Sequence, residues 1–96
     1  MTLDNKSYLY LRDCLGNIAE ELQPTFTEAE RSAVFEFIDV GEYGLAFDSI
    51  CSIVLEKNIT ISREIYDRLS ELGKLMELNP DTWTKLKPPA SRPPVR

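Results

Sequence analysis

The chain has 96 residues, of which 43% are hydrophobic, and a formal net charge of −5. A chain of this length buries about 65% of the surface of its unfolded state, which is enough for one domain with its own core and without a disulfide or a metal. It contains no histidine, so the commonest general base and the commonest transition-metal ligand are absent, which argues against Ser-His-Asp or Cys-His catalysis.

The first predicted element is an amphipathic helix from Asp4 to Leu22, because its apolar residues recur at steps of three and four. Its core-facing stripe is predicted to consist of Tyr8, Leu11, Leu15, Ile18 and Leu22, widened by Cys14 and Ala19. Gly16 destabilises a helix by about 1 kcal/mol relative to Ala, so either packing offsets this cost or another helix approaches closely there. Pro24 is expected to end the helical region.

A second helix is predicted from Thr27 to Ile38. Thr27 and Glu30 have the spacing of a capping box, in which a hydroxyl and a carboxylate each accept an otherwise unpaired amide proton. The apolar side of this helix is predicted to consist of Ala29, Val34, Phe37 and Ile38. The acids Glu28, Glu36 and Asp39 are expected to face solvent or a partner, and the short connection to the next helix makes the two helices neighbours.

The segment from Gly41 to Asn58 has the highest apolar content and is predicted to form the central helix, Glu42 to Lys57, with Asn58 as a left-handed C-cap. Its polar side chains, Asp48, Ser52 and Glu56, recur at every fourth position along one stripe. Apolar residues cover the rest, so neighbours are expected on several sides. A buried strand over Ile50–Leu55 is the alternative, but the apolar pattern is longer than a strand.

Ser62 is predicted to N-cap a fourth helix with the apolar stripe Ile65, Leu69, Leu72 and Met76. Asn79 and Pro80 then predict a short fifth helix from Pro80 to Leu86, with Trp83 and Leu86 closing the core. The prolines of Lys87–Arg96 indicate a disordered tail. The predicted fold is therefore all-α: one compact helical-bundle domain over residues 1–86, with four main helices and a short fifth, and a tail over residues 87–96.

The two cysteines, Cys14 and Cys51, both lie within apolar helical patterns, which favours packed thiols in a reducing compartment over a disulfide or a zinc site. The sequence shows neither a signal-peptide pattern nor a run of about 18 apolar residues. Cytoplasmic localisation is therefore expected, with no membrane partner.

Acidic residues are concentrated in one third of the chain. The segment from Glu20 to Glu56 holds nine acids and the single base Arg31, a balance of −8, whereas residues 1–19 and 57–86 each balance at zero. Such a run is either a solvated face or a negative recognition surface, and it argues against nucleic acid or an anionic membrane as the ligand of that face. The residues alone thus indicate an acidic binding module for a basic protein, with no enzymatic activity and no cofactor; a carboxylate-pair hydrolase is a distant alternative.

The residues from Gly41 to Leu86 resemble those of the MafI-type immunity proteins, which accompany polymorphic toxins of bacteria, including those of contact-dependent growth inhibition systems. The resemblance is carried by Glu42-Tyr43-Gly44-Leu45-Ala46, then Cys51, Ile61-Ser62, Leu72-Gly73, Met76 and Trp83. It implies a protein that binds a cognate toxin domain in the cytoplasm and blocks it stoichiometrically. Such toxins are very often nucleases, including RNases, whose substrate clefts are basic.

For a nuclease partner, the expected toxin-binding residues are Glu36, Asp39, Glu42, Tyr43 and Asp48. The carboxylates would stand in for substrate phosphates, and Tyr43 would supply an apolar contact beside them. The alternative function is an acidic helical adaptor or regulatory subunit of a cytoplasmic complex. The oligomeric state is not predicted.

Four of the residues that carry the resemblance also have purely structural interpretations. Tyr43 either packs between helices or reaches the interface with its hydroxyl. Gly44 and Gly73 are expected to be close-packing sites, because a missing side chain lets helices approach. Trp83 is expected in the core, the alternative being an exposed interface anchor.

Overall fold

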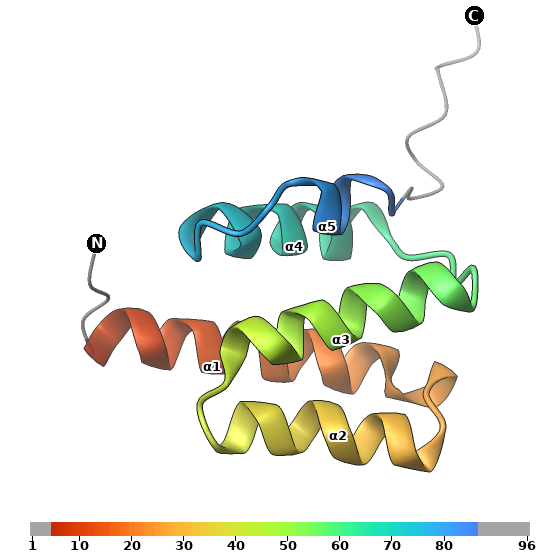
Figure 1. Cartoon of the computed structure of the whole chain (residues 1–96), viewed down its shortest axis with the longest axis horizontal. Coiled ribbons are helices and arrows are strands. Elements are labelled where there is room, and N and C mark those ends of the chain that lie inside the picture. Colours follow the sequence, from red (N-terminus) through yellow and green to blue (C-terminus); the bar gives the residue numbers. More distant parts are fainter. Residues whose placement is uncertain (1–4, 87–96) are drawn as a thin grey trace, which may run out of the picture. The chain divides into compact units, whose positions relative to one another are not determined.

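The computed structural model describes residues 5–86 of the chain. Its elements are α1 (Asn5–Leu22), the 3-10 helix η1 (Gln23–Thr25), α2 (Glu28–Asp39), α3 (Tyr43–Glu56), α4 (Arg63–Leu75) and α5 (Asp81–Thr84) (Figure 1). No strand occurs within the described range, so the all-α prediction of four main helices and a short fifth is confirmed, and the strand alternative over Ile50–Leu55 is excluded. Asp4 and the predicted tail over residues 87–96 lie outside the described residues.

The chain divides into two compact units, Met1–Ile50 and Cys51–Arg96, with the boundary inside α3. The single domain over residues 1–86 stays a prediction. In the first unit, α1 and α2 run in opposite directions and contact each other, and η1 lies at the reversal (Figure 1). The Thr25 hydroxyl tightens this reversal by donating to the Leu22 carbonyl oxygen at 2.6 Å.

The core of the first unit is built from one apolar stripe on each helix. The buried residues are Leu11, Leu15, Ile18, Ala19 and Leu22 of α1, Val34 and Ile38 of α2, and Ala46, Phe47 and Ile50 of α3. Two predicted core positions are wrong: Tyr8 is 44% exposed, and Ala29 is also exposed. Both lie in the first turns of their helices, where the stripe continues beyond the residues that cover it.

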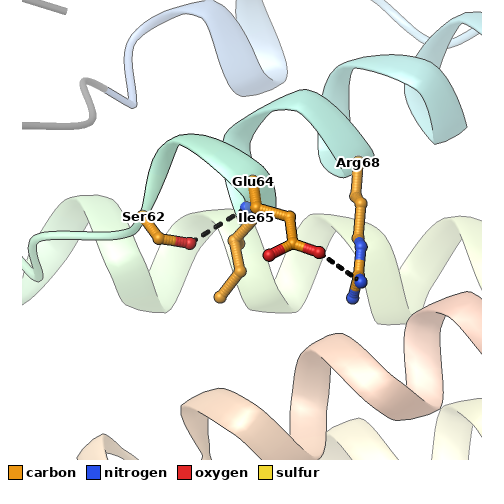
Figure 2. Close-up of polar contacts among 4 residues, drawn as sticks. All are labelled: Ser62, Glu64, Ile65 and Arg68. Atoms are coloured by element: carbon orange, nitrogen blue, oxygen red, sulfur yellow. Dashed lines mark hydrogen bonds and ion pairs between the residues drawn. The ribbon is translucent and has the colours of Figure 1, made fainter. Parts of the chain in front are cut away.

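The N-caps predicted at Thr27 and Ser62 both form, whereas Pro80, predicted at the first helical position after an Asn79 cap, is itself the N-cap of α5. Thr27 Oγ1 accepts the Glu30 N–H at 3.1 Å while Glu30 Oε1 accepts the Thr27 N–H at 2.8 Å, which completes the capping box of α2. Ser62 Oγ accepts the Ile65 N–H at 3.1 Å at the start of α4 (Figure 2). Glu30 therefore has the structural role that its spacing from Thr27 predicts.

Three helices end in the same backbone arrangement, a left-handed residue followed by a reversal. Gly41 after α2 has φ 82°, and Asn58 after α3 and Glu77 after α4 each have φ 58°. In each case the left-handed residue donates to a carbonyl three positions back and the next residue donates five positions back, which is a Schellman motif. The left-handed cap predicted at Asn58 is confirmed, whereas the one at Glu77 is not visible in the sequence, because glutamate is not a residue that favours this conformation.

In the second unit, α4 contacts α5. Its buried residues include Ile65, Leu69 and Leu72 of α4, with Trp83 and Leu86. Trp83 is 3% exposed, so its core interpretation is confirmed. Asn79 Oδ1 accepts the Asp81 N–H at 2.9 Å, but α5 is shorter than the predicted Pro80–Leu86. Met76 is only half-buried, because it caps the end of α4.

The central helix is less enclosed than predicted. Leu45 is 48% exposed and Leu55 is 49% exposed, and they lie on the same stripe as the exposed Asp48 and Ser52. Burial of Ala46, Phe47, Ile50, Cys51, Ile53 and Val54 agrees with the expected neighbours on several sides, but Leu45 and Leu55 of the apolar set lie at the surface. Cys51 is buried and Cys14 is half-buried, and neither forms a disulfide within the described residues, as predicted for packed cysteines.

Candidate interaction surface

An acidic stripe follows the exposed side of α2. Glu28, Ser32, Glu36 and Asp39 are all exposed, and their spacing of four, four and three places them on one helix face. The opposite side carries Val34 and Ile38, which are buried in the core. The amphipathic pattern of α2 thus fixes its acids at the surface of the first unit.

Two of these acids oppose the dipole of their own helix. Glu36 and Asp39 lie in the last turn of α2, which contains no basic residue. The carboxyl end of a helix carries partial negative charge, so each acid there destabilises the helix, typically by about 0.3 to 1 kcal/mol. Within the described residues, neither side chain makes an ion pair or a hydrogen bond that would offset this cost.

Helix α4 shows how the same chain arranges charges that serve its own stability. Glu64 lies in the first turn and Lys74 in the last, both favourable with respect to the dipole. Arg68 donates to Glu64 at 2.7 Å, and Arg63 lies 3.3 Å from Asp67, both pairs being four residues apart (Figure 2 shows the first). The acids of α4 are thus compensated locally, in contrast to those at the end of α2.

The turn between α2 and α3 holds Asp39 and Glu42 in a defined backbone arrangement. Gly41 N–H donates to the Ile38 carbonyl oxygen at 3.1 Å, and Glu42 N–H donates to the Phe37 carbonyl oxygen at 2.8 Å. The Glu42 carbonyl oxygen in turn accepts the Ala46 N–H at 2.9 Å and so begins α3. Glu42 is exposed, and its side chain has no ion pair or hydrogen bond within the described part of the chain.

Beside this turn, two tyrosines form an aromatic pair. The ring centroids of Tyr8 on α1 and Tyr43 at the start of α3 lie 6.3 Å apart, with the ring planes tilted by 41°. Each ring continues the core-facing stripe of its helix one turn beyond the last buried residue, Leu11 on α1 and Ala46 on α3. Tyr43 is half-buried and Tyr8 is exposed, so the pair presents ring surface to solvent.

The predicted binding residues occupy two places. Glu36, Asp39, Glu42 and Tyr43 follow one another through the last turn of α2, the turn and the first residue of α3. Asp48 is exposed on the stripe of α3 that also carries Leu45 and Ser52, well away around the helix from Tyr43. The structure thus groups four of the five residues, and whether any of them binds a partner stays a prediction.

Two exposed apolar residues near this group were not among the predicted site residues. The sequence predicts Tyr8 in the core, and Val40, which is 64% exposed, lies directly between Asp39 and the turn glycine. The high exposure of Val40 follows from its position as the C-cap of α2, beyond the last residue of the buried stripe. That position was visible in the sequence, whereas the partner of Tyr8 was not.

The glycines divide between packing and open space. An added Cβ at Gly73 would overlap the six-membered ring of Trp83, so the close-packing prediction is confirmed there. At Gly44 an added Cβ would meet no described heavy atom within 4 Å, so the same prediction is wrong for Gly44. Gly16 is also open, which leaves packing elsewhere in α1 to offset its helix cost.

No protein-family model, curated protein or solved structure matches the chain. The resemblance to MafI-type immunity proteins therefore stays a prediction. In the range that the structure describes, no helix combines the length and apolarity needed to cross a bilayer, and no three histidine, cysteine or acidic residues cluster as metal ligands would.

Proposed function

We propose that this protein is a non-enzymatic binding module that neutralises a basic bacterial toxin domain by covering it with the acidic surface of α2 and the α2–α3 turn. The observation that carries the proposal is the position of Glu36 and Asp39 in the last turn of α2, where they oppose the helix dipole and have no ion pair within the described residues. A local arrangement that destabilises its own helix without compensation is typical of a functional surface. The resemblance to immunity proteins supports a toxin as the partner, and a nuclease as its class.

The mechanism of neutralisation follows from charge complementarity. A nuclease that binds a phosphate backbone needs Lys and Arg side chains in its cleft. Glu36, Asp39 and Glu42 would pair with those side chains and exclude the substrate, with no cofactor and without contacting nucleic acid. Complementary charges act mainly on the association rate and on specificity, so binding should weaken as salt screens them.

Co-expression with candidate toxin domains tests the proposal. One toxin domain should lose its lethality in the presence of this chain and should co-purify with it. Binding kinetics at two salt concentrations should then show slower association and a weaker salt dependence for Glu36→Lys, Asp39→Lys and Glu42→Lys. Asp48→Ala should have a smaller effect, because Asp48 lies on another stripe of α3.

Glu71→Lys on the charge-balanced helix α4 is the matched control and should bind like the wild type. If Glu71→Lys lost affinity while the three reversals on α2 and the turn did not, the recognition surface would lie on α4. Specific binding to a basic protein without any effect on toxicity would instead favour the adaptor function. Failure to protect against every toxin domain tested, with no basic partner bound, would contradict the proposal.

A further inference from the structure

We infer that the surface formed by the rings of Tyr8 and Tyr43, together with Gly44, is the docking point for an arginine-bearing segment of the partner protein. This inference rests on the proposed function for the identity of the partner. It goes further in naming an anchor that the acidic residues alone do not define, and in specifying arginine rather than lysine.

The first step is the exposure of the aromatic pair. Tyr8 is 44% exposed although its ring centroid lies only 6.3 Å from that of Tyr43. Exposed apolar side chains that lie together mark interaction surfaces more often than singly scattered ones do. The exposed Val40, three residues before Tyr43, adds to the apolar area on the same turn.

The second step is the open space at Gly44. Glycine is unfavourable in a helix, and within the described residues no atom lies close enough to an added Cβ at this position to require it. Gly44 directly follows Tyr43 in the first turn of α3. The missing side chain leaves the helix backbone beside the Tyr43 ring accessible to an incoming chain.

The third step identifies the occupant by its chemistry. Asp39 and Glu42 lie at the end of α2 and in the turn that leads directly into Tyr43, and neither has an ion pair within the described part of the chain. A guanidinium group stacks on an aromatic face while its remaining N–H groups donate to nearby carboxylates. A lysine ammonium can satisfy the carboxylates, but it is a point charge without a planar face to stack on the rings. Aromatic rings beside unpaired acids therefore favour arginine.

The experiment uses defined probes, so it needs no identified toxin. The full chain, labelled with nitrogen-15, is titrated with a nona-arginine peptide, a nona-lysine peptide of equal charge and an uncharged Gly-Ser peptide, and amide shifts are followed by NMR. We expect the largest shifts at Tyr8, Val40, Tyr43 and Gly44, no shifts with the uncharged peptide, and a Kd about two- to five-fold lower for arginine than for lysine.

Substitutions at Tyr8 test whether the aromatic face of its ring, and not only its apolar area, gives the preference for arginine. Tyr8→Leu should remove the preference for arginine, and Tyr8→Phe should keep it, because the π face is retained. Gly44→Ala should weaken binding of the arginine peptide while leaving the fold intact. Gly16→Ala, the same change at another open helix position, should bind like the wild type.

Equal affinity for the two charged peptides, or shifts confined to Glu28 and Ser32 on the α2 stripe, would overturn the inference. Concentration-dependent shifts without any peptide would overturn it too, since a second copy of the chain would then occupy the surface. If the chain prefers the arginine peptide but neutralises no toxin, the proposed function is contradicted and the docking point stands. If the chain neutralises a toxin but does not prefer the arginine peptide, the proposed function stands and the docking point is overturned.

Discussion

Gly73 is the described glycine at which the structure leaves no room for a side chain. An added Cβ would lie 2.8 Å from Cη2 of Trp83 and closer still to Cε3 and Cζ3. The indole is 3% exposed and cannot move without opening the core of the second unit. Gly73→Ala should therefore lower the free energy of unfolding by about 1 to 3 kcal/mol, less any gain in helix propensity. Urea unfolding followed by circular dichroism measures this change.

The matched control is Gly16→Ala, which makes the same substitution in a helix where no described atom lies within 4 Å of the new Cβ. It should raise the free energy of unfolding by up to about 1 kcal/mol, because alanine is a better helix former and restricts the unfolded chain. The two variants should thus change stability in opposite directions. Equal stabilisation by both would show that Trp83 is not seated on Gly73.

At the scale of the helix, α4 ends at a residue that does not suit its conformation. Glu77 has φ 58°, and a non-glycine residue in the left-handed region costs about 1 to 2 kcal/mol. Glu77→Gly should therefore stabilise the protein by about 1 kcal/mol while keeping the Leu78 N–H bond to the Gly73 carbonyl.

Gly41→Ala, the reverse change at the end of α2, should destabilise the protein by a similar amount, because Gly41 has φ 82°. Urea unfolding measures both variants, and a destabilised Glu77→Gly would be the contradicting result.

Helix ends were more predictable from the sequence than the contacts between helices. The capping box of Thr27 and the N-cap of Ser62 depend on residues within one turn, and both form as predicted. The contact between Tyr8 and Tyr43 joins residues of two different helices. Apolar periodicity gives the face on which each ring lies but not the ring that it meets, so the sequence predicts Tyr8 only as part of the core-facing stripe of α1.

The acidic part of the candidate surface was predictable for a related reason. Charge is a property of composition, and the local balance of −8 from Glu20 to Glu56 needs no fold to be counted. The position of Glu36 and Asp39 against the dipole depends only on where α2 ends. The open space at Gly44 was not predictable, because a sequence does not show whether a neighbour fills the place of a missing side chain.

At the scale of the whole molecule, the uneven distribution of charge affects both the stability of the fold and the proposed binding of a basic partner. The acids from Glu20 to Glu56 face one base, so they repel one another in the folded state. The segment from residue 57 to 86 has equal numbers of acids and bases and contains the ion pairs of α4. Salt should therefore stabilise the fold at low ionic strength, because screening reduces repulsion in the acidic segment more than it weakens the exposed pairs.

The same substitution at two acids should have opposite effects on stability. Glu36→Lys places a cation in the last turn of α2 and removes one repelling charge, so it should raise the free energy of unfolding by about 0.5 kcal/mol and make it less dependent on salt. Glu64→Lys places a cation in the first turn of α4 and breaks the 2.7 Å contact with Arg68, so it should lower stability by a similar amount. Thermal unfolding at low and high salt measures both variants. If Glu36→Lys is more stable than the wild type but no longer neutralises a toxin, this acid serves binding at the expense of the fold. If Glu36→Lys is less stable, Glu36 has a structural partner. That result would remove the main support for the acidic surface as a binding site.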